Sequence, residues 1–334
     1  MISLTLRRLA CCNVLLIIVV LISSNIANAG DSDMNWSGRI DFLYLSRTDA
    51  DKKPLVGNNN GTFATPQDDT PLMDTDDLSL DWEPGVRAEI DRGIGGGRKM
   101  SLSAFWLNSF SESDGLTVTD GSLDVPFNSD IAGSMDGANH VEVDYGSDFY
   151  GLEANLHQPI FSDFLTAIFG MRYLRLDEDL DIFSIDADAV TTGEYEIHTD
   201  NQMLGLQVGL EKKISLQQNN KTSITLGVKT GVLNNWSRQR QHIIDQNSTS
   251  PVTIRTNSSD DTKTSLLGEA RVEISHMLSK RVGIDVGYQV LALGNVALAP
   301  DQLDYDAPLA TTGDDVHFDN VAYHGAYIGV GVRW

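Results

Sequence analysis

Residues 326–334 read AYIGVGVRW, and every second residue of this stretch is apolar. Because successive side chains of a β-strand point to opposite faces, this pattern predicts a strand with one apolar and one polar face. Tyr327, Arg333 and two glycines occupy the second face. The apolar face carries Ala326, Ile328, Val330, Val332 and Trp334.

The same alternation recurs along the rest of the chain and predicts ten strands. Several of them exceed the usual five or six residues of a globular strand. Their length suits a tilted strand that crosses a membrane and extends beyond it. The predicted ranges are about 35–47, 82–92, 98–110, 140–157, 163–180, 194–214, 221–238, 263–278, 281–295 and 320–334.

The connections between these strands alternate between short and long. The short ones are 93–97, 158–162, 215–220 and 279–280, whereas the long ones are 48–81, 111–139, 181–193, 239–262 and 296–319. Short turns on one side and long loops on the other are typical of outer-membrane barrels, with the turns in the periplasm. We therefore predict an all-β fold, a transmembrane antiparallel β-barrel of about ten strands. A short apolar alternation at Leu116–Thr119 predicts either an extracellular hairpin or two further strands, which would make twelve.

The N-terminal residues have the features of a cleavable secretory signal peptide. Arg7 and Arg8 precede the apolar run Val14–Ile22, and Ala27–Ala29 forms an A-x-A cleavage site. We expect residues 1–29 to be removed and residues 30–334 to form a single outer-membrane barrel domain. The chain's two cysteines, Cys11 and Cys12, would leave with the signal.

The charge of the chain excludes one large class of partner. The formal net charge is −23, from 47 acidic and 24 basic residues. Binding to nucleic acid requires a basic surface, so the chain does not have the composition of a nucleic-acid-binding protein. We expect an outer-membrane location in a Gram-negative-type bacterium, with lipid as the surrounding medium.

Two stretches resemble a known family. Residues 148–156 (DFYGLEANL) and 169–180 (FGMRYLRLDEDL) are similar to a hairpin of planctomycete-type outer-membrane β-barrel proteins. They also resemble the Legionella-type pore-forming outer-membrane protein family. The resemblance implies a barrel with a signal peptide and a porin-type role, and it implies no catalytic residues.

The C-terminus resembles the signal that marks bacterial outer-membrane barrels for their assembly machinery. That signal is a terminal aromatic residue preceded by alternating apolar residues. In this sequence it would consist of Tyr323, Ile328, Val330, Val332 and Trp334. The resemblance implies the barrel assembly machinery as a partner.

Polar strand positions are expected to face the lumen. Inward glycines such as Gly170, Gly287 and Gly329 would leave space among the polar side chains. The sequence therefore does not decide between an open pore and a lumen filled by side chains. If the lumen conducts, an acidic excess would favour small cationic solutes. The candidate lumen-lining residues are Arg39, Asp41, Arg87, Glu89, Asp91, Glu153, Arg172, Glu211, Lys229, Glu269, Arg271, Glu273, Asp285 and Arg333.

No motif for catalysis, a cofactor or a tightly bound metal occurs in the sequence. Acidic loop clusters such as Asp74–Asp77 and Asp260–Asp261 are consistent with weak Ca²⁺ binding at most. We therefore predict a porin-like channel or a structural envelope protein without catalysis. The alternatives are a surface adhesin that acts through its acidic loops, or an outer-rim protease of the ten-stranded type using His242, Asp245, Asp315 and His317. The sequence does not give the solute or the oligomeric state.

Overall fold

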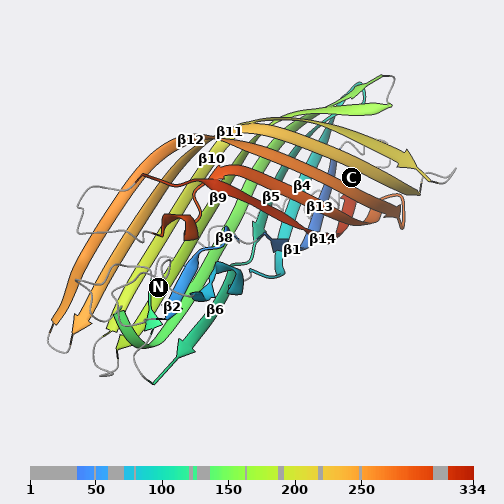
Figure 1. The fold of residues 1–334 in the computed structure, drawn as a ribbon. Helices are drawn as coiled ribbons and strands as arrows, with labels where there is room; N and C mark the ends of the chain where they lie inside the picture. The colour runs from blue at the N-terminus through green and yellow to red at the C-terminus, as the bar shows by residue number, and fades with distance from the viewer. Residues whose placement is uncertain are drawn as a thin grey trace.

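Ten antiparallel strands form a closed ring in the computed structural model (Figure 1). The structure describes residues 36–48, 50–58, 71–78, 80–119, 123–125, 136–161, 164–186, 192–216, 221–247, 250–303 and 315–334. The ring consists of β1 (Trp36–Arg47), β4 (Glu83–Gly95), β5 (Arg98–Leu107), β8 (Asp136–Ile160), β9 (Leu165–Asp186), β10 (Thr192–Ser215), β11 (Thr222–Asn247), β12 (Ser250–Met277), β13 (Val282–Val296) and β14 (Asp319–Arg333).

Each ring strand pairs with the next one along the chain, and the last pairs with the first. The closing pair runs from Ser37 opposite Arg333 to Arg47 opposite Tyr323. Closure leaves no unpaired edge within the membrane, where water cannot satisfy backbone groups. The predicted all-β barrel of about ten strands is confirmed. The predicted residues 1–29 of the signal peptide lie outside the described residues.

The two ends of the barrel differ. At one end, called the turn end, short connections join β4 to β5, β8 to β9, β10 to β11 and β12 to β13. Gly95, Gly96 and Gly97 have φ angles of 86°, 64° and 71°, which only glycine adopts readily, so this segment is a tight turn. Trp36 and Trp334 also meet at the turn end through two backbone hydrogen bonds. The opposite end is called the loop end.

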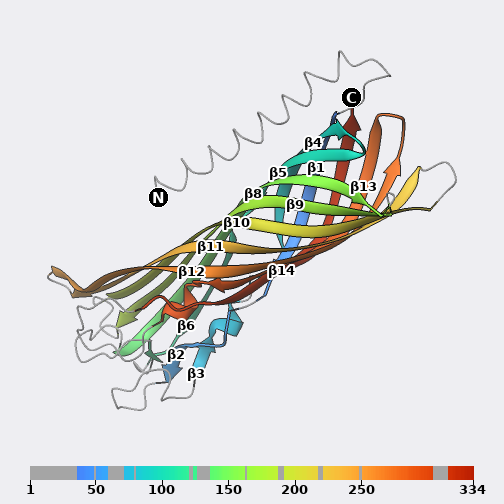
Figure 2. The same cartoon turned by 90° about the horizontal axis from the view of Figure 1, so that it is seen from above.

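The loop end contains short elements and strand extensions that the sequence analysis missed. β2 (Pro54–Asn58), β3 (Pro71–Asp74) and β6 (Phe110–Thr117) gather there, opposite the C-terminus (Figure 2). β6 pairs with β8, as does β7 (Leu123–Asp124), so the described residues between 111 and 135 add no strand to the ring. The predicted loop 239–262 was wrong, because β11 and β12 continue through most of it as a hairpin. Two 3₁₀ turns, η1 (Thr75–Asp77) and η2 (Pro300–Gln302), complete the described elements.

Apolar side chains cover the outside of the ring on the side nearer the turn end. On β10, for example, Leu204, Leu206 and Val208 are 41%, 71% and 50% exposed, whereas Gln207 between them is buried. Large apolar side chains exposed on every second position form a belt suited to lipid. Among the described residues, no helix is both long and apolar enough to cross a membrane.

Candidate functional site: the barrel lumen

The structure places the candidate lumen residues on the face opposite the apolar belt. Although these side chains are charged, all except Arg333 are buried or half-buried. Arg333 is exposed at the turn end. Buried charges are stable only when they are paired and hydrogen-bonded, so their partners determine what the lumen can do.

One group of ion pairs spans the lumen between β8, β9, β11 and β12. Lys229 Nζ lies 2.8 Å from Glu153 Oε1 and 2.9 Å from Glu269 Oε1. Arg172 Nη2 lies 2.6 Å from Glu269 Oε2 and also pairs with Glu153. Two strands separate β8 from β11 in the ring, and two separate β9 from β12. These side chains therefore meet across the interior and do not simply line one wall.

A second group of ion pairs and hydrogen bonds connects β1, β4, β12 and β13 inside the barrel. Arg39 pairs with Glu273 of β12 at 2.7 Å and with Glu89 of β4 at 3.1 Å. Arg87 pairs with Asp41 at 2.7 Å and donates a hydrogen bond of 2.6 Å to Gln289 of β13. Arg271 pairs with Glu211 at 2.7 Å. We call this pair and the two groups together the ionic layer: Arg39, Asp41, Arg87, Glu89, Glu153, Arg172, Glu211, Lys229, Glu269, Arg271 and Glu273.

Three inward glycines, Gly170, Gly287 and Gly329, do not leave open space. A Cβ on Gly329 would collide with the Asp41 carboxylate, and one on Gly287 would collide with the Tyr327 ring. A Cβ on Gly170 would collide with the side chain of Asn155. These glycines let neighbouring side chains lie flat across the strands, so they contribute to a filled lumen.

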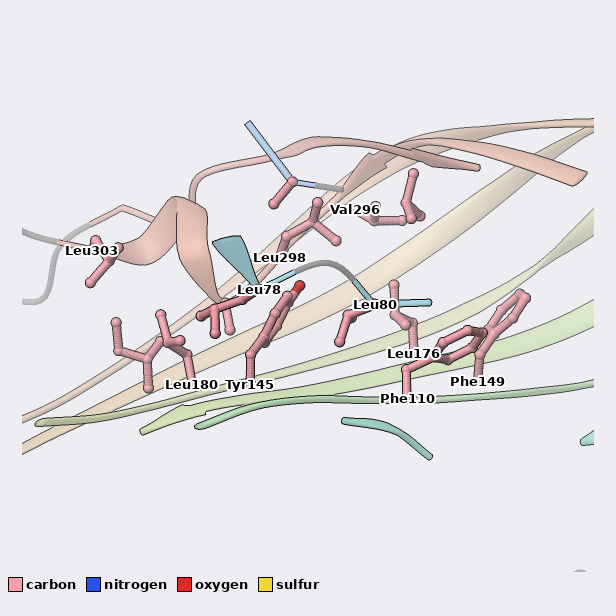
Figure 3. Close-up of a cluster of buried hydrophobic side chains, with 14 of the residues drawn as sticks. Leu78, Leu80, Phe110, Tyr145, Phe149, Leu176, Leu180, Val296, Leu298 and Leu303 are labelled. Atoms are coloured by element: carbon pink, nitrogen blue, oxygen red, sulfur yellow. The ribbon is translucent and has the colours of Figure 1, made fainter. Parts of the chain in front are cut away.

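An apolar core occupies the lumen between the ionic layer and the loop end. Figure 3 shows Val296 and Leu298 facing Tyr145, Leu176 and Leu180 from the opposite wall. Val296 and Leu298 begin a run that leaves β13 and continues into η2, and Ala297, Leu298 and Ala299 are fully buried. We call residues 295–303 the cap segment. It lies inside the barrel, whereas the sequence analysis predicted a long loop for 296–319.

Buried polar side chains hold the cap segment in place. Glu178 Oε2 accepts a hydrogen bond of 2.9 Å from the Ala299 backbone N–H, and Glu178 Oε1 lies 2.6 Å from Arg47 Nη2. Asn201 accepts from the Ala297 N–H at 2.7 Å and donates to the Ala297 carbonyl at 2.8 Å. Arg47, Glu178 and Asn201 are fully or almost fully buried, and the sequence analysis identified none of them.

A water-accessible vestibule lies between the ionic layer and the turn end. Its volume is about 400 Å³, whereas a smaller cavity of about 50 Å³ separates the ionic layer from the apolar core. Six basic side chains line the vestibule (Arg39, Lys99, Lys213, Lys221, Arg271 and Arg333) together with five acidic ones (Glu89, Asp91, Glu211, Glu273 and Asp285). The vestibule itself therefore has no acidic excess, whereas the ionic layer contains six acidic and five basic side chains. The preference for cations stays a prediction.

The five residues of the predicted assembly signal do not share one face. Ile328 and Val330 are 53% and 52% exposed on the apolar belt, and Trp334 pairs with Trp36 at the turn end. Tyr323 is buried in the lumen, with its ring 4.5 Å from that of Phe149. Recognition by the assembly machinery stays a prediction.

Among the described side chains, no hydrogen bond or ion pair joins the residues proposed for a protease. His242 Nδ1 lies 2.9 Å from Thr256 Oγ1, and His317 is held through its backbone by Gln302. The side chain of Asp245 lies outside what the structure describes. Among the described residues, no cluster of histidine, cysteine, aspartate or glutamate is arranged to hold a metal ion.

Comparison with known proteins identifies a family. The profile of the family described as "Putative beta barrel porin-7 (BBP7)" matches residues 114–330, more than half of the chain. No curated protein matches the sequence.

Solved outer-membrane barrels are similar to the chain at low identity. The translocator domain of the autotransporter NalP from Neisseria meningitidis has 11% identity and a TM-score of 0.37, over 97% of this chain and 96% of that one. The outer-membrane protease OmpT from Escherichia coli has 7% identity and a TM-score of 0.45, over 92% and 99%. The P. putida toluene transporter TodX has 8% identity and a TM-score of 0.31, over 91% and 90%.

Proposed function

This chain belongs to the putative beta barrel porin-7 family of porin-like outer-membrane barrels, and we propose that it is a non-conducting structural member whose lumen is closed. The observation that carries the proposal is the ionic layer, in which side chains from strands far apart in the ring meet across the interior. The apolar core and the cap segment add a second barrier nearer the loop end.

Each barrier opposes a different part of solute passage. A hydrated ion that crosses the ionic layer must separate paired charges such as Lys229 and Glu153, and each would then be left buried without a partner. A polar solute that crosses the apolar core must lose its hydration among Leu176, Leu180 and Leu298, which offer no hydrogen bonds in return. Together, the two barriers support a barrel that is closed at rest.

We also propose that the protein has no catalytic activity. The one histidine–aspartate pair within 2.5 Å among the described residues, His198 with Asp179, lies on the outer face of the barrel near the loop end. The interpretation as an adhesin stays a prediction, because much of its acidic loop sequence falls outside the described residues.

A narrow solute channel is the second candidate function. The vestibule of about 400 Å³ supports it, because it gives small solutes access to the lumen from the turn end. Passage would then require the cap segment and the ionic layer to move. Because both signs of charge line the vestibule, its lining alone does not support the predicted preference for cations.

Liposome swelling distinguishes the two functions. The protein would be purified from the outer membrane, reconstituted, and checked for folding by its heat-dependent shift on a gel. We expect liposomes with the folded protein to swell in small sugars and amino acids no faster than empty liposomes. An open porin in the same lipids is the positive control, and swelling that approaches its rate would replace the structural function with the channel.

A further inference from the structure

Most acidic side chains of the turn-end vestibule already have a basic partner. Glu211 pairs with Arg271 at 2.7 Å, and Asp91 pairs with Lys99 at 3.1 Å. Glu89 and Glu273 both pair with Arg39. Asp285 forms no ion pair among the described residues, and the nearby Ser275 hydroxyl donates to Glu273 Oε1 at 3.2 Å. The negative charge of the lining is therefore largely neutralised.

Two basic side chains of the same lining, Lys213 and Arg333, form no ion pair among the residues that the structure describes, although Glu211 and Glu273 lie close enough to attract Lys213. Lys213 belongs to β10 and Arg333 to β14, with three strands of the ring between them. Both are exposed and line the same cavity, and like charges that face one cavity repel each other. An anion between them would relieve this repulsion.

We propose that the vestibule binds a small soluble oxyanion, a molecule with carboxylate or phosphate groups, between Lys213 and Arg333. Charge-assisted hydrogen bonds from lysine and arginine to such groups are among the strongest in proteins. The hydroxyl groups of Ser215, Ser223 and Thr225 lie in the same lining and supply neutral donors.

The size and position of the vestibule define the class of ligand. A cavity of about 400 Å³ is in the range of small-molecule pockets, so a compact metabolite fits and a folded macromolecule does not. The chain carries a net charge of −23, and two unpaired cations at one mouth therefore form a local exception to its overall field. The site depends on the turn end alone, so it does not require the lumen to conduct.

Neighbouring residues on β10 provide a matched pair of variants. Lys213 lines the vestibule, whereas Lys212 lies on the outside of the barrel with Nζ 3.5 Å from the Phe164 ring centre. Lys213→Gln and Lys212→Gln remove the same charge from adjacent positions. They differ only in the face from which it is removed.

The experiment is calorimetric titration of the folded protein, in an uncharged detergent, with inorganic phosphate and with citrate. Ionic strength is held constant with chloride, because screening alone weakens exposed charge interactions. We expect one saturable site, and about tenfold weaker binding in Lys213→Gln and in Arg333→Gln, since each loses one charge-assisted hydrogen bond. Lys212→Gln should bind as the wild type does.

Three other outcomes overturn the proposal. The first is the absence of saturable binding to either probe, and the second is an equal loss in Lys212→Gln and Lys213→Gln. The third concerns the source of the anion: a short-chain anionic phospholipid that binds more tightly than both soluble probes, through Lys213, would make the site a lipid headgroup site.

Discussion

Arg47 and Glu178 form an ion pair in the middle of the apolar core, where both side chains have no solvent exposure. Glu178 also accepts hydrogen bonds from Tyr145 and from the Ala299 backbone. Breaking a buried pair leaves a charge without compensation, so Glu178→Gln should lower the free energy of unfolding by about 3–5 kcal/mol. Urea unfolding in lipid vesicles, followed by tryptophan fluorescence, measures this change.

The double variant Arg47→Met/Glu178→Gln is the control for that prediction. It removes both charges, whereas the glutamine still accepts the hydrogen bond from Ala299. We expect it to recover more than half of the lost stability. A single variant as stable as the wild type would show that the pair does not hold the core together.

Gly329 provides a second test at the scale of a residue. A Cβ there would collide with the Asp41 carboxylate and lie 3.1 Å from the Ile40 carbonyl oxygen, whereas a Cβ on Gly268 has nothing within 4 Å. Gly329→Ala should therefore disturb the Arg87–Asp41 pair and cost about 1–3 kcal/mol of unfolding free energy. Gly268→Ala should cost much less in the same unfolding experiment, and equal effects would contradict the close packing of the ionic layer.

Individual strands change the direction of their apolar face along their length. In β8, Val141, Val143 and Phe149 point into the lumen, whereas Leu152 and Leu156 are 45% and 36% exposed on the outside. The outside of a strand faces lipid near the turn end and water near the loop end. The inside carries the ionic layer in one part and the apolar core in the other, so the phase of the alternation reverses between them.

This reversal explains which parts of the molecule could be predicted. The alternation of apolar and polar residues predicts the ten strands and their order, because the period of two is the same whichever face of a strand is apolar. The rule that polar strand positions point inward holds for residues such as Glu153 and Arg172 but fails at Leu174 and Leu176, which are buried in the lumen. The reversal of the apolar–polar alternation near residues 149–152 is visible in the sequence and indicates the apolar core. The cap segment had no such signal, because its burial depends on contacts with distant strands.

The lipid-facing belt leads to a prediction for β10. Leu206 and Ile214 both lie on its outer face and are 71% and 39% exposed, and Leu206 is nearer the middle of the belt. Leu206→Arg should destabilise the barrel by about 2–4 kcal/mol and Ile214→Arg by about 0–1 kcal/mol, because the cost of an exposed charge depends on its depth. Unfolding titrations in vesicles compare the two variants, and equal costs would contradict this position of the barrel in the membrane.

The cap segment should respond to pH through Asp301. Burial raises the pKa of the Asp301 carboxyl to about 6, although Lys53 opposes this shift, with its Nζ 3.5 Å away. A carboxyl whose pKa is raised in the folded state stabilises that state below its unfolded pKa of about 4, and this contribution is lost as the pH rises through 6. The cap segment should therefore be better protected at pH 5 than at pH 8.

Hydrogen–deuterium exchange of residues 295–303, corrected for intrinsic rates, measures that protection. Asp301→Asn should reduce the difference between the two pH values, since the amide does not titrate. Asp76→Asn is the control, because Asp76 is exposed at the loop end. A difference that persists unchanged in Asp301→Asn would assign the pH dependence to another group.

The whole molecule consists of three layers along one axis. A charged vestibule at the turn end is followed by the ionic layer and then by the apolar core with its cap segment. The sequence predicted the barrel around this axis but left the state of its lumen open, because that state depends on side chains from distant strands. Arg172 and Glu269, for example, are 97 positions apart in the chain and meet in the interior.

Single-channel recording in a planar bilayer tests the closed lumen most directly. The folded wild-type protein, with insertion verified by protection of its membrane-spanning strands from protease, should give no discrete conductance steps in concentrated salt. Reproducible steps from the folded, inserted protein would show a continuous aqueous path and contradict the account.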